Sequence, residues 1–324
     1  MKNVAVVCGG NSGEKVISIK SSAFVISSLD ANKYKGYQIV IEGANWNYVA
    51  EDGSEFPVDK NDFSVLIDGK RTKFDVVFNI IHGDPGENGK LQAYFEMLGI
   101  PNTSSDSTVS ALTFNKAYCN HIVRDLGVNV AASIHLFKEN RIDEQAILDR
   151  VGIPCFVKPN SGGSSIGMSR VNAAKDLLPA IEKAFAEDNE ILIEEFFEGR
   201  ELTCGLMETR GQMVVFPICE VVSKKEFFDY EAKYNEGLVE ELIPAPIDNS
   251  VAEVIKANAV FLYKSLHLSG VSRIDFIFKG DEYIFLEVNT IPGLSAQSIV
   301  PNMARSYGWK DSELIDRIIE EAFL

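Results

Sequence analysis

Residues 271–298 (VSRIDFIFKGDEYIFLEVNTIPGLSAQS) constrain the fold and the chemistry of this chain more than any other segment. They read as two strands joined by a short turn at residues 279–282. Because side chains alternate between faces along a strand, Arg273 and Asp275 share one face of the first strand, and Glu287 and Asn289 share one face of the second. The opposite faces are apolar and consist of Ile274, Phe276, Phe278, Ile284, Leu286 and Val288. The pattern predicts a hairpin with one core-facing side and one polar side that can hold a ligand.

The polar side of this hairpin offers a guanidinium group and three side chains that carry oxygen ligands. Ligand sets made only of oxygen suit a hard cation such as Mg²⁺, which proteins commonly share with a phosphate group. The alternative interpretation is a solvated outer face with ordinary ion pairs. The segment alone leaves both interpretations open.

Size and charge narrow the class of protein. The chain has 324 residues, 46% of them hydrophobic, which is enough for two or three domains. A net charge of −16 argues against nucleic acid as a partner, because phosphate repels an acidic surface. The five cysteines form no CxxC pair, as is typical of a reducing compartment. No apolar run suggests a signal peptide or a membrane span, so we expect a cytoplasmic protein without a membrane partner.

The order of elements predicts an α/β and α+β protein with three domains. Residues 1–104 alternate strands with helices, which predicts an open parallel α/β domain. The expected strands are 4–8, 39–41, 65–66 and 76–81, and the expected helices are 16–29 and 89–98. Residues 105–195 read as a smaller α+β domain, with helices at 110–126 and 173–187 and strands at 153–158 and 191–195.

Residues 196–324 are expected to form the third domain around the hairpin. Further strands are expected at 201–208 and 213–222, and helices at 250–266 and 311–322. The polar stretch 223–242 has no clear period. Because a loop of this length is uncommon in a compact protein, we interpret it as a functional lid or a disordered segment.

Two glycine-containing loops follow strands in the first domain. The first (GGNSGE, residues 9–14) precedes a helix, so its backbone N–H groups can meet an anion, but it lacks the GxGxxG spacing of a dinucleotide site. Glu14 in the first helical turn either compensates the helix dipole or binds a substrate ammonium. His82 opens the second loop (HGDPGENG) at the end of a strand, where open α/β sheets bind ligands.

The middle domain carries a third loop and an acidic strand end. Lys158 precedes the loop NSGGSSIG, which is not a Walker A loop but can fold over phosphates with Lys158 as the counter-charge. The segment from Glu194 to Phe197, together with Glu201, can offer backbone groups to a purine and a carboxylate to a ribose.

Taken together, these motifs resemble the ATP-grasp superfamily and, within it, the D-alanine–D-alanine ligase family. The resemblance follows the whole chain in order. Its motifs are residues 9–14, residues 82–89 with Asn88 where Asp is usual, Lys116, residues 158–167, YEAKY at 230–234, and Arg273-x-Asp275 followed by Glu287-x-Asn289-x-x-Pro-Gly293. It implies a three-domain ATP-grasp architecture in which the 223–242 stretch is the lid.

The resemblance also implies a reaction, in which ATP drives the joining of two D-alanine molecules through an acyl phosphate, for peptidoglycan precursor synthesis. It implies two ions, Mg²⁺ or Mn²⁺, held by Asp275, Glu287 and Asn289. The ATP-binding residues that it implies are Lys116, Lys158, Glu194, Phe196, Phe197, Glu201 and Lys233. The protein would act as a homodimer.

The remaining implied roles concern the two amino acids. Glu14 would hold the first ammonium group, and Ser164 and Tyr234 would link the lid to the site through Glu14. Arg273 and the Gly293 N–H would stabilise the tetrahedral oxyanion. The second carboxylate would meet Ser298, and His82 and Ile299 complete the implied substrate-binding set. Ile299 stands where the family usually has Leu, which bears on specificity for the second substrate.

The motifs disfavour three rival functions. A D-alanine–D-lactate (depsipeptide) ligase is disfavoured by the tyrosine at position 234, which goes with dipeptide formation in the resemblance. A non-catalytic nucleotide sensor is expected to lose a metal ligand or Arg273, and both are present here. A nicotinamide oxidoreductase would need the fingerprint that residues 9–14 lack.

Overall fold

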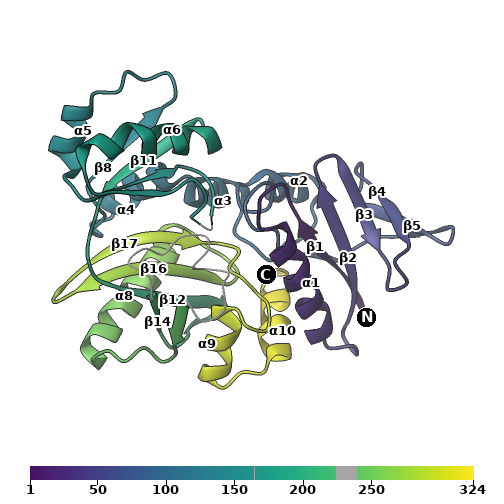
Figure 1. Cartoon of the computed structure of the whole chain (residues 1–324). Helices are drawn as coiled ribbons and strands as arrows, with labels where there is room; N and C mark the ends of the chain where they lie inside the picture. The colour runs from purple at the N-terminus through teal and green to yellow at the C-terminus, as the bar shows by residue number, and fades with distance from the viewer. Residues whose placement is uncertain (164, 224–238) are drawn as a thin grey trace.

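The computed structural model describes residues 1–163, 165–223 and 239–324. Within these residues the strands form three sheets of seven, four and six strands, in chain order. Figure 1 shows the N-terminal sheet at the right, the middle sheet with its helices at the upper left, and the C-terminal sheet below it. This mixed α/β arrangement confirms the predicted fold class. The domain boundaries after residues 104 and 195 remain a proposal.

The N-terminal sheet is parallel only at one side, where β2, β1 and β7 lie in that order. Its strands are β1 (Lys2–Gly9), β2 (Tyr34–Glu42), β3 (Asn45–Val49), β4 (Glu55–Asp59), β5 (Ser64–Ile67), β6 (Lys70–Thr72) and β7 (Val76–Asn79). The apolar run from Val4 to Cys8 is fully buried in β1, which pairs in parallel with β2 and β7. Strands β3 to β6 extend the sheet in antiparallel fashion. The predicted parallel pairing is therefore confirmed for β1, β2 and β7. The antiparallel part of the sheet was not predicted.

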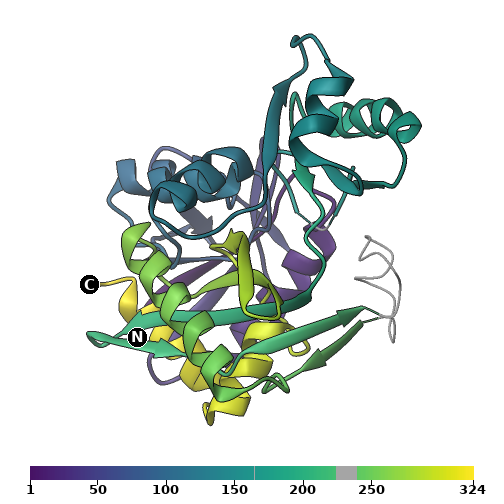
Figure 2. The same cartoon turned by 90° about the vertical axis from the view of Figure 1, so that its left-hand side faces the viewer.

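The middle sheet is a separate antiparallel unit. Its strands run in the order β10 (Ser169–Val171), β9 (Cys155–Pro159), β11 (Glu190–Glu195) and β8 (Ser133–Phe137). Helices α5 (Glu144–Val151) and α6 (Leu177–Glu187) pack on it, with a short 3₁₀ turn at Ala174–Asp176 before α6. Figure 2 shows this unit in teal, projecting from the rest of the molecule. Its own apolar core makes it a small body that carries β9 and β11 to the site.

The C-terminal sheet forms the largest part of the site. Its strands are β12 (Arg200–Thr209), β13 (Gln212–Val215), β14 (Cys219–Ser223), β15 (Val239–Leu242), β16 (Ser272–Lys279) and β17 (Glu282–Asn289). Helix α8 (Asn249–Ser265) covers one face, as the green helix in Figure 2 shows. Residues of α9 (Ile299–Tyr307) and α10 (Asp311–Glu321) join those of β1 and β7 in one apolar cluster. The first and last parts of the chain therefore share a core.

The prediction of a single helix at residues 110–126 is wrong, because the helix is interrupted at Asn115. Helix α3 (Ser107–Phe114) ends there and α4 (Lys116–Asp125) begins. The Asn115 backbone is extended, and its side chain accepts a hydrogen bond from the Tyr118 N–H at 3.0 Å, as an N-cap residue does. The break places Lys116 in the first turn of α4. Both helices pack on β17.

The strand predicted at residues 213–222 is also wrong. The chain forms β13 and β14, which pair with different parts of β12. Pro217 lies between them and has no N–H to donate to a ladder. Both ends of the stretch 223–242, predicted as a lid, belong to strands, since Ser223 of β14 pairs with Val239 of β15. Its remaining residues, 224–238, lie outside the described residues.

A β-bulge corrects the predicted faces of the hairpin. The pairing of β16 with β17 shifts between Asp275 and Phe276, so that Glu287 lies opposite Asp275 but Phe285 lies opposite Phe276. Leu286 is the extra residue, and a bulge of this kind moves the side chains between it and the hairpin turn to the other face. Ile284 and Leu286, predicted on the core face, therefore line a cavity, while Phe285 joins the core and also borders that cavity.

Helix α1 (Lys15–Ser28) follows the first glycine loop, and α2 (Lys90–Leu98) follows the loop that His82 opens. As predicted, α2 ends at Gly99, which adopts the left-handed conformation with φ of 64°. In the part of the chain that the structure describes, no helix has the length and apolar character needed to cross a bilayer.

Candidate active site

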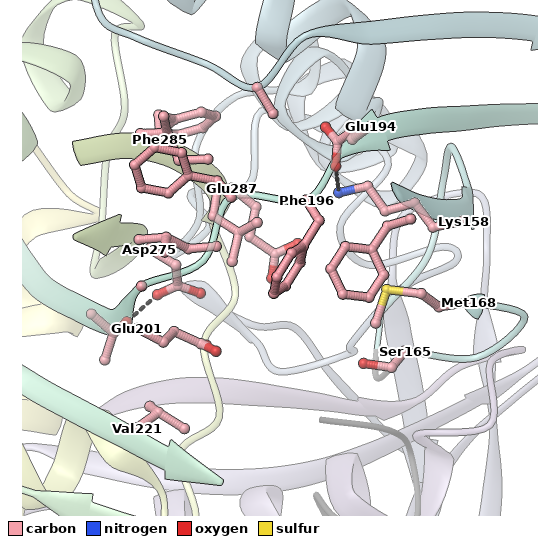
Figure 3. Close-up of a pocket in the computed structure, with 18 of the residues that line it drawn as sticks. Lys158, Ser165, Met168, Glu194, Phe196, Glu201, Val221, Asp275, Phe285 and Glu287 are labelled. Carbon is pink, nitrogen blue, oxygen red and sulfur yellow. Dashed lines mark hydrogen bonds and ion pairs between the residues drawn. The ribbon is translucent and has the colours of Figure 1, made fainter. Parts of the chain in front are cut away.

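A cavity of about 740 Å³ lies between the middle sheet and the C-terminal sheet. We call the surface formed by Phe156, Lys158 and Glu194 of β9 and β11 the upper wall. The lower wall is the surface formed by Thr203, Asp275 and Glu287 of β12, β16 and β17. Figure 3 shows residues of both walls around one space. A volume of this size suits a ligand as large as a nucleotide.

The upper wall contains a buried ion pair. The Lys158 ammonium contacts the Glu194 carboxylate, and both side chains are almost fully buried (Figure 3). The other Glu194 oxygen accepts a hydrogen bond from the Asn120 side-chain amide at 2.9 Å. Lys158 and Glu194 come from neighbouring strands and are therefore held by the sheet. A cation fixed in this way can meet phosphate without moving far.

Phe156 of the upper wall belongs to a group of apolar and aromatic side chains that line the cavity. The rings of Phe156 and Phe196 meet edge to face at 5.7 Å between centroids. The Arg170 guanidinium lies 4.3 Å from the centre of the Phe196 ring, a cation–π contact. Phe197 and Met168 also line the cavity. Flat apolar surfaces of this kind suit a planar base.

The lower wall places two carboxylates opposite each other. Asp275 and Glu287 are cross-strand partners in β16 and β17, and Arg273 and Asn289 are the next pair on the same face. The Arg273 Nη2 lies 2.8 Å from Asp275 Oδ2, and the Asn289 amide donates to the same oxygen at 3.1 Å. Burial lowers the pKa of Arg273, but the charge of Asp275 raises it more, so the guanidinium stays charged.

These lower-wall residues have the chemistry of a magnesium site. Like charges directly opposite in an antiparallel pair are destabilising, and a cation between Asp275 and Glu287 would remove that cost. Their donor atoms are oxygens, as Mg²⁺ prefers. Across the described ranges, no group of three or more His, Cys, Asp or Glu side chains is placed to hold a metal ion. The predicted set has two carboxylates and one amide, so Asn289 would have to supply the third oxygen if this set held a metal ion.

Lys116 connects the glycine loop to the lower wall. Its ammonium donates to the Gly162 carbonyl at 2.7 Å and lies 3.5 Å from Glu287 Oε2. Asn160, fully buried, fixes the base of this arrangement, since its side-chain oxygen accepts from the Ala117 N–H at 2.9 Å. The break before α4 thus brings the lysine to the point where the loop faces the carboxylates.

The N-terminal loops reach the same site from the side. The Glu14 carboxylate lies so close to Gly163 that a Cβ atom there would be 3.0 Å from Oε2. His82 Nδ1 lies 3.0 Å from the Ile291 carbonyl oxygen, just before Gly293. The structure therefore brings residues 1–104 against the middle loop and against the end of β17.

The predicted site residues at the start of α9 also lie close together. A Cβ atom on Gly293 would be 3.0 Å from the Ser298 hydroxyl oxygen. That hydroxyl accepts a hydrogen bond from the Ser295 N–H at 2.9 Å. Ile299 follows as the first residue of α9 and lines the cavity. The serine is thus presented beside the Gly293 backbone, where a carboxylate can bind a helix N-terminus.

Most of the predicted residues therefore gather at one place. Ten line the cavity, namely Lys116, Lys158, Glu194, Phe196, Phe197, Glu201, Arg273, Asp275, Glu287 and Ile299. Five lie beside it through the contacts given above, namely Glu14, His82, Asn289, Gly293 and Ser298. Ser164, Lys233 and Tyr234 lie outside the described residues.

Comparisons with known proteins agree with this geometry. Family profiles described as "D-ala D-ala ligase N-terminus" and "D-ala D-ala ligase C-terminus" match residues 3–105 and 122–320. The chain is 45% identical to a D-alanine–D-alanine ligase of Flavobacterium johnsoniae over 320 residues, which covers 99% of each chain. It is 44% identical to that of Parabacteroides distasonis over 321 residues, covering 99% of this chain and 97% of the relative. The chain belongs to the D-alanine–D-alanine ligase family.

Solved structures of the family extend the agreement to the fold. The VanG D-Ala:D-Ser ligase from Enterococcus faecalis has a TM-score of 0.86 at 32% identity and covers 99% of both chains. A D-alanine–D-alanine ligase from Bacillus anthracis complexed with ATP has a TM-score of 0.80 at 29% identity, over 100% of this chain and 98% of that one. The resemblance inferred from the motifs is confirmed.

The site of this ligase also contains residues that the sequence interpretation missed. They are Thr203, Asn120, Asn160 and Arg170. Thr203 could have been found, because it lies two residues after Glu201 and so shares its face of one strand. Asn120 and Arg170 gave no such signal, since each reaches the site across a contact between distant segments.

Proposed function

We propose that this ligase uses ATP to join two D-alanine molecules into D-alanyl-D-alanine, a precursor of peptidoglycan. The observation that carries the proposal is the position of Lys116. Its ammonium lies between the Gly162 carbonyl and the Glu287 carboxylate, so that a cationic group, a glycine loop and an opposed carboxylate pair face one cavity. That combination suits phosphoryl transfer, in which catalysis is mainly positioning and charge stabilisation.

The upper wall would hold the nucleotide. Phe156 and Phe196 offer apolar surfaces to adenine, and Glu201 lines the cavity where it can accept from the ribose hydroxyls. Lys158 and Lys116 would meet the phosphates. Because Lys158 is already paired with Glu194, its charge is held at the wall before ATP arrives.

Asp275, Glu287 and Asn289 would hold the divalent cations on the lower wall. When bound, Mg²⁺ supplies positive charge that offsets the phosphate oxygens. Lys116 sits beside Glu287 and can contact the phosphate that leaves ATP. The carboxylate of the first D-alanine attacks the γ-phosphate, ADP leaves, and the carboxylate becomes an acyl phosphate. The neutral amine of the second D-alanine then attacks the acyl carbon, inorganic phosphate leaves, and the nitrogen loses a proton as the amide forms.

The two amino acids would bind at the N-terminal side of the cavity. Glu14 holds the ammonium group of the first D-alanine, with His82 beside it. Ser298 binds the second carboxylate at the start of α9. The oxyanion formed by the second attack meets the Arg273 guanidinium and the Gly293 N–H, and preorganised donors of this kind are typically worth several kcal/mol. The predicted homodimer and cytoplasmic location stay predictions.

ATP turnover tests the proposal. We expect phosphate release with D-alanine and Mg²⁺, and product analysis should find D-alanyl-D-alanine. Reactions with L-alanine, without amino acid, and with EDTA serve as controls and should release little phosphate. Equal turnover with L-alanine, or turnover without a divalent cation, would contradict the proposal. Mixed D-alanine and D-lactate distinguish the depsipeptide alternative, which would yield an ester product.

A further inference from the structure

Thr203 belongs to the lower wall, contacts its central carboxylate, and has no task in the reaction proposed above. It lies in β12, directly opposite Asp275 in the pairing of β12 with β16. The side chain is 1% exposed, and its hydroxyl donates a hydrogen bond to Asp275 Oδ1. Asp275 itself is 2% exposed. This pair is therefore a buried contact fixed by the register of two strands.

The direction of this contact separates Thr203 from the other partners of Asp275. Strand β16 lies between β12 and β17 in the sheet. Glu287 and Asn289 stand on the β17 side, whereas Thr203 reaches Asp275 from the β12 side. The hydroxyl therefore binds the carboxylate from the side away from the proposed metal ligands.

The other two donors to Asp275 have other tasks during the reaction. The Asn289 amide donates to Oδ2 at 3.1 Å, but Asn289 would have to turn its oxygen to a cation. The Arg273 Nε donates to Oδ1 at 3.0 Å, but its guanidinium would also meet the oxyanion. Among the described residues that donate to Asp275, Thr203 is the one that contacts neither the substrates nor the metal in the proposed reaction. Its hydrogen bond can therefore persist throughout.

The chemistry of threonine suits a fixed partner. Its β-branched side chain has a restricted χ1 angle, so the hydroxyl is held in one direction. A buried hydroxyl needs a hydrogen-bond partner, and the carboxylate supplies one. Carboxylates that bind metals are usually oriented by such partners, and removing one typically lowers metal affinity by about 10- to 100-fold.

We propose that the Thr203 hydroxyl is a positioning group, which orients the Asp275 carboxylate for a divalent cation. The inference rests on the proposed function, because it assumes that Asp275 binds the metal. Loss of the hydroxyl should weaken the response of nucleotide binding to Mg²⁺ and leave the D-alanine end of the site unchanged.

The test compares three variants with the wild-type chain. Thr203→Val keeps the shape and removes the hydroxyl, and Thr203→Ser restores it. Thr209→Val is the matched control, because Thr209 lies on the same strand, is 2% exposed and has a hydroxyl without a hydrogen-bond partner among the described residues. Calorimetry measures the affinity for ADP over a series of Mg²⁺ concentrations. The Mg²⁺ concentration that gives half of the full increase in ADP affinity is the Mg²⁺ midpoint, and it does not depend on turnover.

We expect Thr203→Val to raise that Mg²⁺ concentration about 10-fold, with Thr203→Ser and Thr209→Val within about twofold of the wild type. The KM for D-alanine should stay within about twofold in all variants. An unchanged Mg²⁺ midpoint in Thr203→Val, in a wild-type background that depends on Mg²⁺, would overturn the inference. A loss that Thr203→Ser does not restore would also overturn it, because the hydroxyl would then not be the cause.

The experiment also distinguishes a failure of the proposed metal role and a failure of the variant to fold. If wild-type protein binds ADP equally with Mg²⁺ and with EDTA, the proposed metal role itself fails, and this inference fails with it. If Thr203→Val lacks a cooperative unfolding transition, Thr203→Ala replaces it in the same comparison with Thr203→Ser. The Mg²⁺ midpoint of that pair then supports or overturns the inference.

Discussion

The two walls of the cavity handle buried charge in opposite ways. On the upper wall, Lys158 and Glu194 form a closed ion pair, and the Asn120 amide satisfies the carboxylate further. On the lower wall, Asp275 and Glu287 lie opposite each other in the sheet. Arg273 lies 2.8 Å from Asp275, and Lys116 lies 3.5 Å from Glu287. One wall pairs a cation with an anion on neighbouring strands, whereas the other sets two carboxylates opposite each other and takes its cations from Arg273 and Lys116.

The difference shows how one cavity can serve two kinds of ligand. The upper wall can accept a large organic group beside a fixed lysine, because its charges are already paired. A wall with opposed carboxylates is stabilised by an added cation. Both walls consist of ordinary paired strands, so the distinction depends on which side chains face the cavity. Four substitutions should break or sharpen this contrast.

Glu287→Gln should have the largest effect on activity. We expect kcat to fall about 10²- to 10³-fold, since charge stabilisation by a bound metal contributes several kcal/mol. The unfolding midpoint in urea should not fall, because the change removes a repulsion with Asp275. Glu282→Gln at the exposed start of the same strand is the control and should keep normal turnover. Near-normal turnover of Glu287→Gln would remove this residue from the site.

Lys158→Met tests the upper wall. Removing one partner of a buried ion pair leaves the other charge uncompensated, so we expect the free energy of unfolding to fall by about 3 kcal/mol. The double variant with Glu194→Leu should recover most of that loss, while ATP affinity stays low in both. Urea denaturation and ATP calorimetry measure the two effects. A single variant as stable as the wild type would show that the pair is not buried in solution.

Gly163→Ala tests the junction between the middle loop and the first domain. The added Cβ would lie 3.0 Å from Glu14 Oε2, so the carboxylate must move. We expect the KM for D-alanine to rise about 10-fold, equivalent to about 1.4 kcal/mol, with less change in the KM for ATP. Steady-state kinetics at varied D-alanine and varied ATP provide the check. Equal increases of both constants would place the disturbance in the loop rather than at Glu14.

Glu87→Gln should have the smallest effect, and it tests whether the charges of the lower wall affect a carboxyl group in residues 1–104. Burial raises the pKa of the Glu87 carboxyl to about 7, against a hydrogen bond from the Gly83 N–H, and the charges of Glu14 and Glu287 add to the rise. A carboxyl with a raised pKa binds its proton more tightly in the folded state. Stability therefore falls as the pH rises from about 4.5 to about 7.

In the Glu87→Gln variant that pH dependence should flatten by ~1 kcal/mol, allowing for partial solvent access from the cavity. Urea unfolding at several pH values, with Glu282→Gln as the control, measures the difference. If both variants keep the slope of the wild type, Glu87 does not titrate in this range.

The sequence by itself determined the chemical groups of the site and the order in which they occur. The alternation in residues 271–298 placed Arg273 and Asp275 on one face and Glu287 and Asn289 on one face, and both pairs are found together. Strict spacing made this possible, because a period of two assigns side chains to faces without knowledge of the rest of the fold. The motifs were sufficient to indicate the family.

Only the tertiary structure decided how these faces meet. Because of the bulge beside Asp275, Ile284 and Leu286 line the cavity. No local sequence pattern predicts an extra residue in one strand of a pair. The break at Asn115 depends on its side chain capping the next helix, and the Thr203 contact depends on the pairing of β12 with β16. Such features arise from contacts between segments far apart in the chain, which propensity and periodicity do not describe.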